Sequence, residues 1–204
     1  MAERLALGTA QFGMPYGIAN RTGQVSDAEA QDILQQARGA GIDTLDTAMA
    51  YGESEARLGA LGVRAWQVVT KLPAVDDHCA DVHGWVQQSL ASSLERLRVD
   101  RLYALLLHRP AQLLGSRGDE IFRALTDVKS QGVVGKIGVS IYAPAELEQL
   151  WPCFRPDLVQ APFNVLDRRL SDSGWKIYVE SRYHYAFSNI PSTVIPVTFG
   201  LRFN

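Results

Sequence analysis

The chain has 204 residues, enough to bury one substantial hydrophobic core without requiring a second domain. Hydrophobic residues make up 47% of it and charged residues 21%, as in ordinary globular proteins. The 20 basic and 22 acidic residues nearly balance, and no basic block runs along the sequence. These features argue against nucleic acid and membrane as partners.

Short apolar runs alternate with amphipathic segments over the first 160 residues. Ser26 and Glu29 have the spacing of a capping box, and apolar residues follow at helical intervals until Gly39 and Gly41. The same patterns predict five further strand–helix alternations. The expected strands are 5–7, 44–46, 66–71, 101–107, 136–140 and 157–160, and the later helices are 53–61, 82–97, 121–128 and 144–150.

Six strand-then-helix units in series indicate an α/β protein with a parallel sheet and right-handed crossovers. A barrel and an open doubly wound sheet both satisfy this pattern. The alternation stops near Trp175. Beyond it, 176–187 and 192–203 read as strands with no amphipathic helix between them.

Four titratable residues of different kinds stand where predicted strands end. Asp46 ends the second strand and Tyr51 follows it, Lys71 ends the third, and His108 follows the fourth. Carboxyl ends of parallel strands meet on one face, so these side chains are expected to form one hydrogen-bonded cluster suited to proton transfer. Each residue alone also reads as a helix cap, a solvated strand end or a core histidine.

Cysteine and histidine spacing gives no sign of a structural metal or a disulfide. Cys79 and Cys153 lie far apart and match no zinc or disulfide pattern, which favours a reducing cytoplasm. His78, Cys79 and His83 lie near an expected helix start, where solvated side chains are the better interpretation. We expect no bound metal.

Six short motifs follow one another along the chain. They are LGTAQFG at 7–13, DTAMAYG at 46–52, VVTK at 68–71, LLHRP at 106–110, GVS at 138–140 and QAPFN at 160–164. Each is weak alone, but together and in this order they resemble the aldo-keto reductases over about residues 5–175. The resemblance implies a (β/α)8 barrel of the TIM type, here incomplete with six clear units and a strand-like tail. It also implies an NADPH cofactor and reduction of an aldehyde or ketone to an alcohol.

The resemblance assigns catalytic roles to the four titratable residues. Tyr51 becomes the general acid that protonates the carbonyl oxygen. A phenol with a pKa of ~10 is a poor acid at neutral pH, and a neighbouring ammonium lowers that pKa. Lys71 would supply this ammonium, Asp46 would hold Lys71 by an ion pair, and His108 would orient the substrate oxygen.

The same resemblance predicts that Thr9, Asp46, Ser140 and Gln160 bind the cofactor. Ser140 and Gln160 correspond to residues that hold the nicotinamide carboxamide from the ends of the fifth and sixth strands. Ile141 stands where many members have asparagine, so one amide contact differs. From the residues alone, Ser140 and Gln160 read equally well as helix caps or strand-end contacts.

The tail departs from the family. An eight-stranded barrel takes ~250 residues, and its phosphate site lies after strands seven and eight. We therefore expect a barrel-like part at 1–175 and a divergent tail at 176–204, which covers an open barrel edge or pairs across a dimer interface. NADPH binding is expected to be weak or lost.

Two other functions remain open at this point. The chain can be a catalytically silent, truncated relative that acts in binding or self-association, since six strands without closure leave two exposed edges. A barrel metal hydrolase fits less well because no convergent set of histidine and carboxylate ligands is visible.

Overall fold

A computed structural model describes residues 4–17, 20–162, 169, 180–183 and 198–202. Its strands are β1 (Arg4–Gly8), β2 (Thr44–Asp46), β3 (Gln67–Leu72), β4 (Leu102–Leu107), β5 (Val134–Ser140), β6 (Leu158–Pro162), β7 (Glu180–Tyr183) and β8 (Thr198–Arg202). Its α-helices are α1 (Ala10–Gly13), α2 (Asp27–Gly39), α3 (Ser54–Leu61), α4 (Val82–Leu97), α5 (Gly118–Ser130) and α6 (Pro144–Leu150). A 3₁₀ helix, η1, spans Pro110–Leu114.

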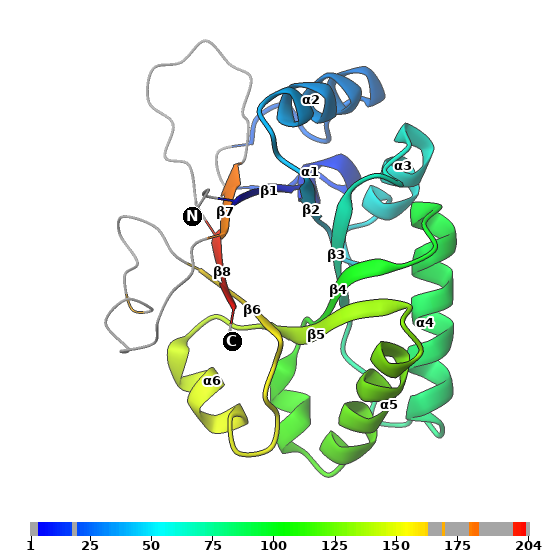
Figure 1. Ribbon diagram of the computed structural model, residues 1–204, viewed down its shortest axis with the longest axis vertical. Coiled ribbons are helices and arrows are strands. Elements are labelled where there is room, and N and C mark those ends of the chain that lie inside the picture. The colour runs from blue at the N-terminus through cyan, green and yellow to red at the C-terminus, as the bar shows by residue number, and fades with distance from the viewer. Residues whose placement is uncertain (1–3, 18–19, 163–168, 170–179, 184–197, 203–204) are drawn as a thin grey trace.

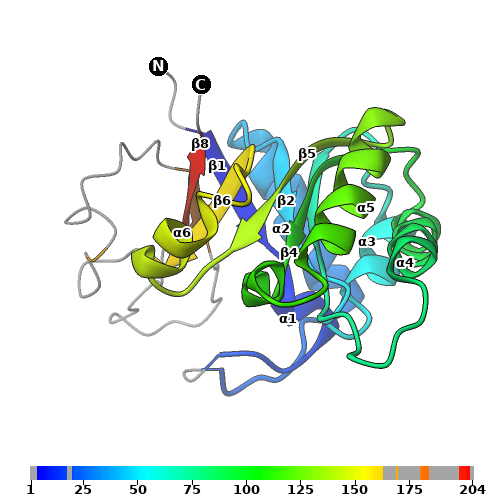
Figure 2. The same ribbon diagram turned by 90° about the horizontal axis from the view of Figure 1, so that it is seen from below.

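Strands β1 to β6 form a parallel sheet in chain order. The sheet curls around a centre, and helices α2 to α6 lie outside it (Figures 1 and 2). A helix between successive parallel strands returns the chain to the amino end of the sheet and covers its outer face. The predicted α/β fold of the TIM type is confirmed, as a curled but incomplete barrel rather than an open doubly wound sheet.

The two edges of this six-stranded sheet are each paired with a short strand from the tail. β7 pairs in parallel with β1, and β8 pairs antiparallel with β6. β7 and β8 also contact each other, between β1 and β6 (Figure 1). A regular barrel has eight parallel strands, so the antiparallel β8 sets this sheet apart. The rest of the tail, 176–179, 184–197 and 203–204, lies outside the described residues.

Local signals explain where the helices begin and end. Ser26 accepts a hydrogen bond from the Glu29 amide, and the Glu29 carboxylate reaches back to the Ser26 amide, so the predicted capping box is confirmed. Gly62 ends α3 in the left-handed region, at φ 82°. The short helices α1 and η1 were not predicted because four or five residues are too few to show helical periodicity.

The core has an outer layer between sheet and helices and a smaller inner layer. Leu45, Leu58, Leu97, Leu105 and Leu125 belong to the outer layer and have exposed fractions of 0%. The inner layer, which Tyr103 packs against, consists of Val69, Ala104, Leu106 and Leu158.

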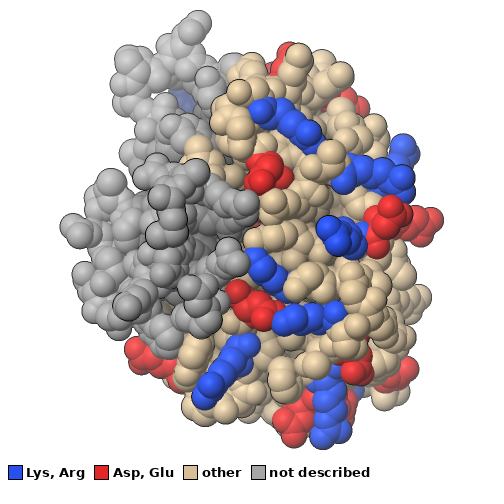
Figure 3. Space-filling model, viewed as in Figure 1, with Lys and Arg blue, Asp and Glu red and all other residues tan. Residues whose placement is uncertain are grey.

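The described surface carries mixed charge. On the face shown in Figure 3, basic and acidic side chains are interspersed over the visible part of the sheet and helices. Within the described ranges, no helix combines the length and the apolar character needed to cross a membrane.

Candidate active site

The strand register brings the predicted site residues to one end of the inner face. Lys71 on β3 lies opposite Leu106 on β4, and Ser140 on β5 lies opposite Gln160 on β6. Side chains alternate between the faces of a strand, so Lys71 and Leu106 share the inner face. His108 comes two residues after Leu106, directly beyond β4. The carboxyl ends of the parallel strands thus gather these polar groups above the apolar inner layer.

Lys71 and Asp46 form a fully buried ion pair. The Lys71 ammonium donates to both Asp46 carboxylate oxygens at 2.9 Å and to the Thr47 carbonyl at 2.7 Å. The Lys71 and Asp46 side chains are 0% and 2% exposed. A buried charge is tolerated only when it is paired and hydrogen-bonded, and these contacts meet that requirement.

Tyr51 completes this cluster. Its phenol oxygen lies 3.4 Å from Lys71 Nζ, and the ammonium is 4.9 Å from the centre of the ring. The turn that carries Tyr51 packs tightly on α1. A Cβ on Gly13 would lie 1.7 Å from the Tyr51 carbonyl oxygen, and one on Gly52 would lie 2.4 Å from the Gly13 carbonyl oxygen. Only glycine allows this close approach of two backbones.

His108 joins the cluster through a ring contact. Its imidazole meets the Tyr51 ring edge to face, with centroids 6.0 Å apart and planes at 82°. The pKa of His108 is lowered from the ordinary histidine value, mainly because burial disfavours the charged ring. The positive charges of Lys71 and Arg109 lower this pKa further, and Asp46 opposes them. This shift favours the neutral form of the imidazole.

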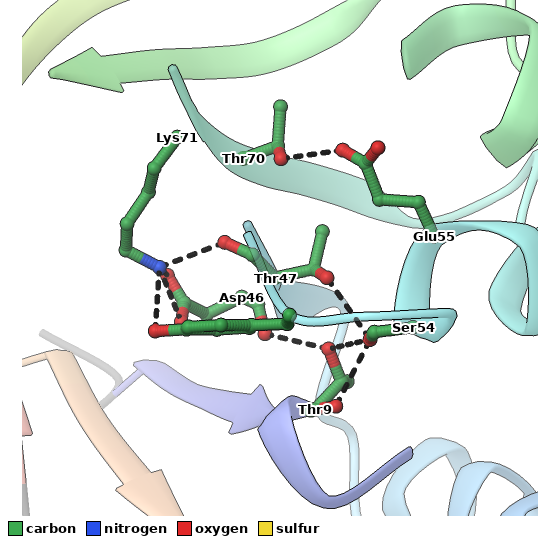
Figure 4. Close-up of polar contacts among 8 residues, drawn as sticks. Thr9, Asp46, Thr47, Ser54, Glu55, Thr70 and Lys71 are labelled. Carbon is green, nitrogen blue, oxygen red and sulfur yellow. Dashed lines mark hydrogen bonds and ion pairs between the residues drawn. The ribbon is translucent and has the colours of Figure 1, made fainter. Parts of the chain in front are cut away.

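Thr9 lies beneath the ion pair, within a chain of buried hydroxyl groups (Figure 4). Its hydroxyl donates to the Asp46 backbone carbonyl at 2.8 Å. Ser54 Oγ lies 2.9 Å from the Thr9 carbonyl oxygen, which accepts its hydrogen, and the Thr47 hydroxyl donates to Ser54 Oγ at 3.0 Å. These bonds fasten the ends of β1 and β2 to the start of α3. The predicted cofactor contact of Thr9 stays a prediction.

Ser140 and Gln160 lie side by side at the ends of β5 and β6. The exposed fraction of Gln160 is 8%. Its side-chain oxygen Oε1 is buried, and it has no hydrogen-bond partner among the residues that the structure describes. Ile141, directly after Ser140, is buried at 2% and donates its amide to the Gln160 carbonyl. Within the described ranges, this corner of the site therefore presents the Ser140 hydroxyl and a side-chain amide oxygen that accepts no hydrogen bond.

Sequence reasoning missed the groups that support the ion pair. Thr47 contributes its backbone carbonyl, which residue type cannot reveal. Ser54 and Glu55 read as ordinary first-turn residues of α3, but both are buried, at 0% and 2%.

Among the described residues, no three or more His, Cys, Asp and Glu side chains lie together in a way that could hold a metal ion. Cys79 and Cys153 are free thiols.

Two proteins similar to this chain in sequence are known by their function or family. An aldo-keto reductase of Mycolicibacterium vanbaalenii is 37% identical over 134 residues, covering 63% of this chain and 46% of the relative. A D-threo-aldose 1-dehydrogenase of a Pseudomonas species is 33% identical over 168 residues, covering 66% and 51%. The chain thus spans about half the length of the curated relatives it matches.

Solved structures agree with the sequence relatives. A crystal structure assigned as an aldo-keto reductase of Pseudomonas aeruginosa superposes with a TM-score of 0.68 at 31% identity, covering 82% of this chain and 66% of that one. An aldo-keto reductase of Bacillus halodurans in its holo form shares the fold, with a TM-score of 0.65 at 20% identity, and covers 83% and 56%. The aldo/keto reductase family model matches residues 4–182. The chain therefore belongs to the aldo/keto reductase family.

Proposed function

We propose that this chain binds NAD(P)H and reduces an aldehyde or ketone to an alcohol, with Tyr51 as the proton donor. The buried position of Lys71 carries the proposal. Its ammonium is balanced by Asp46 on the inside and reaches the half-buried phenol of Tyr51 on the side of the strand ends.

The cluster suits general acid catalysis by a phenol. A positive charge close to a phenol favours the phenolate over the phenol, and Lys71 places its ammonium 3.4 Å from the Tyr51 oxygen. Because Lys71 is fully enclosed, its charge is screened far less by water than a surface lysine would be. Tyr51 can then give its proton to a carbonyl oxygen as negative charge develops on that oxygen.

His108 complements this arrangement as the group that orients the substrate. A neutral imidazole carries one N–H donor, which can bind the carbonyl oxygen without competing for the Tyr51 proton. Its edge-to-face contact with the Tyr51 ring holds the two side chains at the same end of the inner face.

The residues at the ends of β5 and β6 fit a nicotinamide. Ser140 and Gln160 would hold the nicotinamide of a bound cofactor, which would supply the hydride. The buried Gln160 oxygen accepts no hydrogen bond from the residues that the structure describes, so it can accept one from a carboxamide N–H₂ group, and Ser140 lies beside it. NADPH rather than NADH, and the contacts of Thr9 and Asp46 with it, are part of the proposal.

A single variant tests the proposed chemistry. Tyr51→Phe removes the proton donor and keeps the ring that packs on His108. We expect turnover of benzaldehyde with NADPH to fall by ~10²–10⁴-fold, the usual contribution of general acid–base catalysis. The rate is followed by the loss of NADPH absorbance, and an unchanged rate would contradict the mechanism.

The chain supplies a matched control for this variant. Tyr103 also places its phenol oxygen against a lysine, Lys136, which lies 4.0 Å from the centre of its ring. This pair lies near the amino ends of β4 and β5, away from the cluster at the carboxyl ends. Tyr103→Phe should keep the full rate, so a loss in both variants would indicate damage to the fold.

One observation favours a second function. The chain spans about half the length of its curated relatives, and a chain without the part that holds the adenosine end of the cofactor would bind that cofactor weakly. Contacts remote from the reacting carbon supply much of the binding energy of such cofactors. In that case the chain is a catalytically silent relative that acts in binding or self-association. Quenching of tryptophan emission by NADPH separates the two, since a silent chain shows neither quenching nor turnover.

A further inference from the structure

A second buried carboxylate lies on the opposite side of β3 from the ion pair. Glu55, in the first turn of α3, is 2% exposed and has four hydrogen-bond donors. Its Oε1 accepts from Thr70 Oγ1 at 2.6 Å and from Ser93 Oγ at 2.7 Å. Its Oε2 accepts from Nε and Nη2 of Arg96 at 2.8 Å and 2.6 Å. One side chain thus joins α3, β3 and α4.

The Glu55 carboxylate is hydrogen-bonded to β3 at Thr70, the residue before Lys71. Thr70 and Lys71 are neighbours on β3, so their side chains leave opposite faces. In Figure 4 Thr70 points to Glu55 on the helix side, and Lys71 points to Asp46 on the inner side. A shift of Thr70 therefore moves Lys71 as well.

Glu55 also lies close in sequence to Tyr51, the proposed proton donor. Glu55 comes four residues after Tyr51, and the Ser54 amide donates to the Tyr51 carbonyl at 3.1 Å. The turn that carries Tyr51 and the helix that carries Glu55 therefore form one hydrogen-bonded unit.

We propose that Glu55 is a positioning residue that sets the separation of Tyr51 and Lys71 by holding Thr70 against the start of α3. The inference rests on the proposed function, in which this separation controls the proton donor. At 3.4 Å, the contact between Lys71 Nζ and the Tyr51 oxygen is already long for a hydrogen bond, so a small outward movement of β3 removes it.

The primary test is Thr70→Val, which removes the hydroxyl that binds Glu55 and keeps the shape of the side chain. Glu55 keeps its bonds to Ser93 and Arg96, so the helix contacts survive. With ¹³C-labelled tyrosine, the Tyr51 ring signal is assigned by its loss in Tyr51→Phe and followed against pH by NMR. We expect Thr70→Val to raise the pKa of Tyr51 toward the ~10 of an ordinary tyrosine. Thr70→Ser restores the hydroxyl and should restore the original titration.

The other charges around Tyr51 are unchanged in these variants, which keeps the readout specific. Lys71, Asp46 and His108, the titratable groups near the phenol, are not substituted, so only their positions can change. A role confined to stability would lower the melting temperature of Thr70→Val and leave the Tyr51 titration where it was. A Tyr51 signal that titrates at the same pH in wild type and in Thr70→Val, or in neither, would overturn the proposal.

A second pair of variants guards against a folding defect. Glu55→Gln weakens the contacts with Thr70 and Arg96 and should raise the Tyr51 pKa as well; the loss of a negative charge alone would lower it, so a rise reports the changed position of Lys71. Asp157, directly before β6, forms another ion pair, with Lys129 of α5. Asp157→Asn makes the same chemical change there and should leave Tyr51 unaffected. The titration needs neither cofactor nor turnover. A chain that reduces no carbonyl can therefore still show the shift of the Tyr51 pKa, which would support the role of Glu55 alone. An active chain without the shift would support the proposed function and contradict the role of Glu55.

Discussion

At the scale of single residues, the candidate site depends on one charge placed where water cannot reach it. Lys71 is 0% exposed, and its ammonium contacts the Asp46 carboxylate, the Thr47 carbonyl and the Tyr51 phenol. Removing one partner of such a pair leaves the other charge buried and uncompensated. The same residues therefore affect stability and the proposed chemistry together.

Replacing Lys71 with methionine should expose this dependence. We expect Lys71→Met to lower the free energy of unfolding by about 3–5 kcal/mol, because Asp46 stays buried without its cation. Urea unfolding measures the change. The double variant with Asp46→Asn should recover part of the loss. Lys129→Met, in a pair whose side chains are 39% and 32% exposed, should cost only about 1 kcal/mol or less.

The lowered pKa of His108 predicts a pH dependence of stability. In the unfolded chain this histidine has an ordinary pKa of ~6.5, and in the folded chain burial first, then Lys71, lowers it. As the pH falls below about 6.5, the unfolded chain binds a proton that the folded chain resists, so stability falls until the lowered pKa is passed. His108→Gln should make the melting temperature less dependent on pH in this window. His78→Gln, at an exposed position, should not; an equal effect of both would refute the assignment to His108.

At the scale of elements, the start of α3 organises the site. Ser54 ties the helix to the ends of β1 and β2, Glu55 ties it to β3, and Tyr51 lies in the turn before it. The short helix α1 packs against this turn through Gly13 and Gly52, where the two backbones meet. The start of α3 therefore fixes the position of Tyr51, the proposed proton donor, through backbone as well as side-chain contacts.

Adding one methyl group at this contact should displace Tyr51. In Gly13→Ala the new Cβ would lie 1.7 Å from the Tyr51 carbonyl and 2.5 Å from the Ser54 amide, and backbone cannot move aside cheaply. We expect a loss of at least about 1–3 kcal/mol in the free energy of unfolding, measured by urea denaturation. Gly39→Ala, in α2 with nothing within 4 Å, should be neutral or slightly stabilising. Equal stability of the two variants would show that the contact does not constrain the turn.

At the scale of the whole molecule, the tail strands stand where a closed barrel would have its last two strands. β7 covers the edge of β1, and β8 covers the edge of β6. Both pairings use backbone groups that would otherwise be unpaired at a sheet edge. The division into a barrel-like part at 1–175 and a tail at 176–204 stays a prediction, as does self-association through these edges.

Removing the tail strands should make the chain associate. A variant that lacks 180–204 exposes β1 and β6, and free strand edges promote pairing with other chains. We expect light scattering to show a larger mass than for the full chain at equal concentration. A deletion variant that stays monodisperse at the monomer mass would show that the tail strands are not needed to protect these edges.

The sequence predicted much of the fold because its signals are local. Alternating strand and helix patterns placed β1 to β6 and the five longer helices, and the Ser26–Glu29 capping box marked the start of α2. The predicted strand ends also located Asp46, Lys71 and His108, since parallel strands bring their carboxyl ends to one face whatever the details of packing.

Only the tertiary structure decided what supports these residues. Glu55 meets Ser93 and Arg96 across 38 and 41 residues of chain, and Ser54 meets Thr9 across 45. The direction of β8 relative to β6 likewise has no counterpart in strand periodicity, which is the same for parallel and antiparallel pairing. Periodicity and spacing report which face of an element is buried, but the partner it is buried against depends on how distant segments pack.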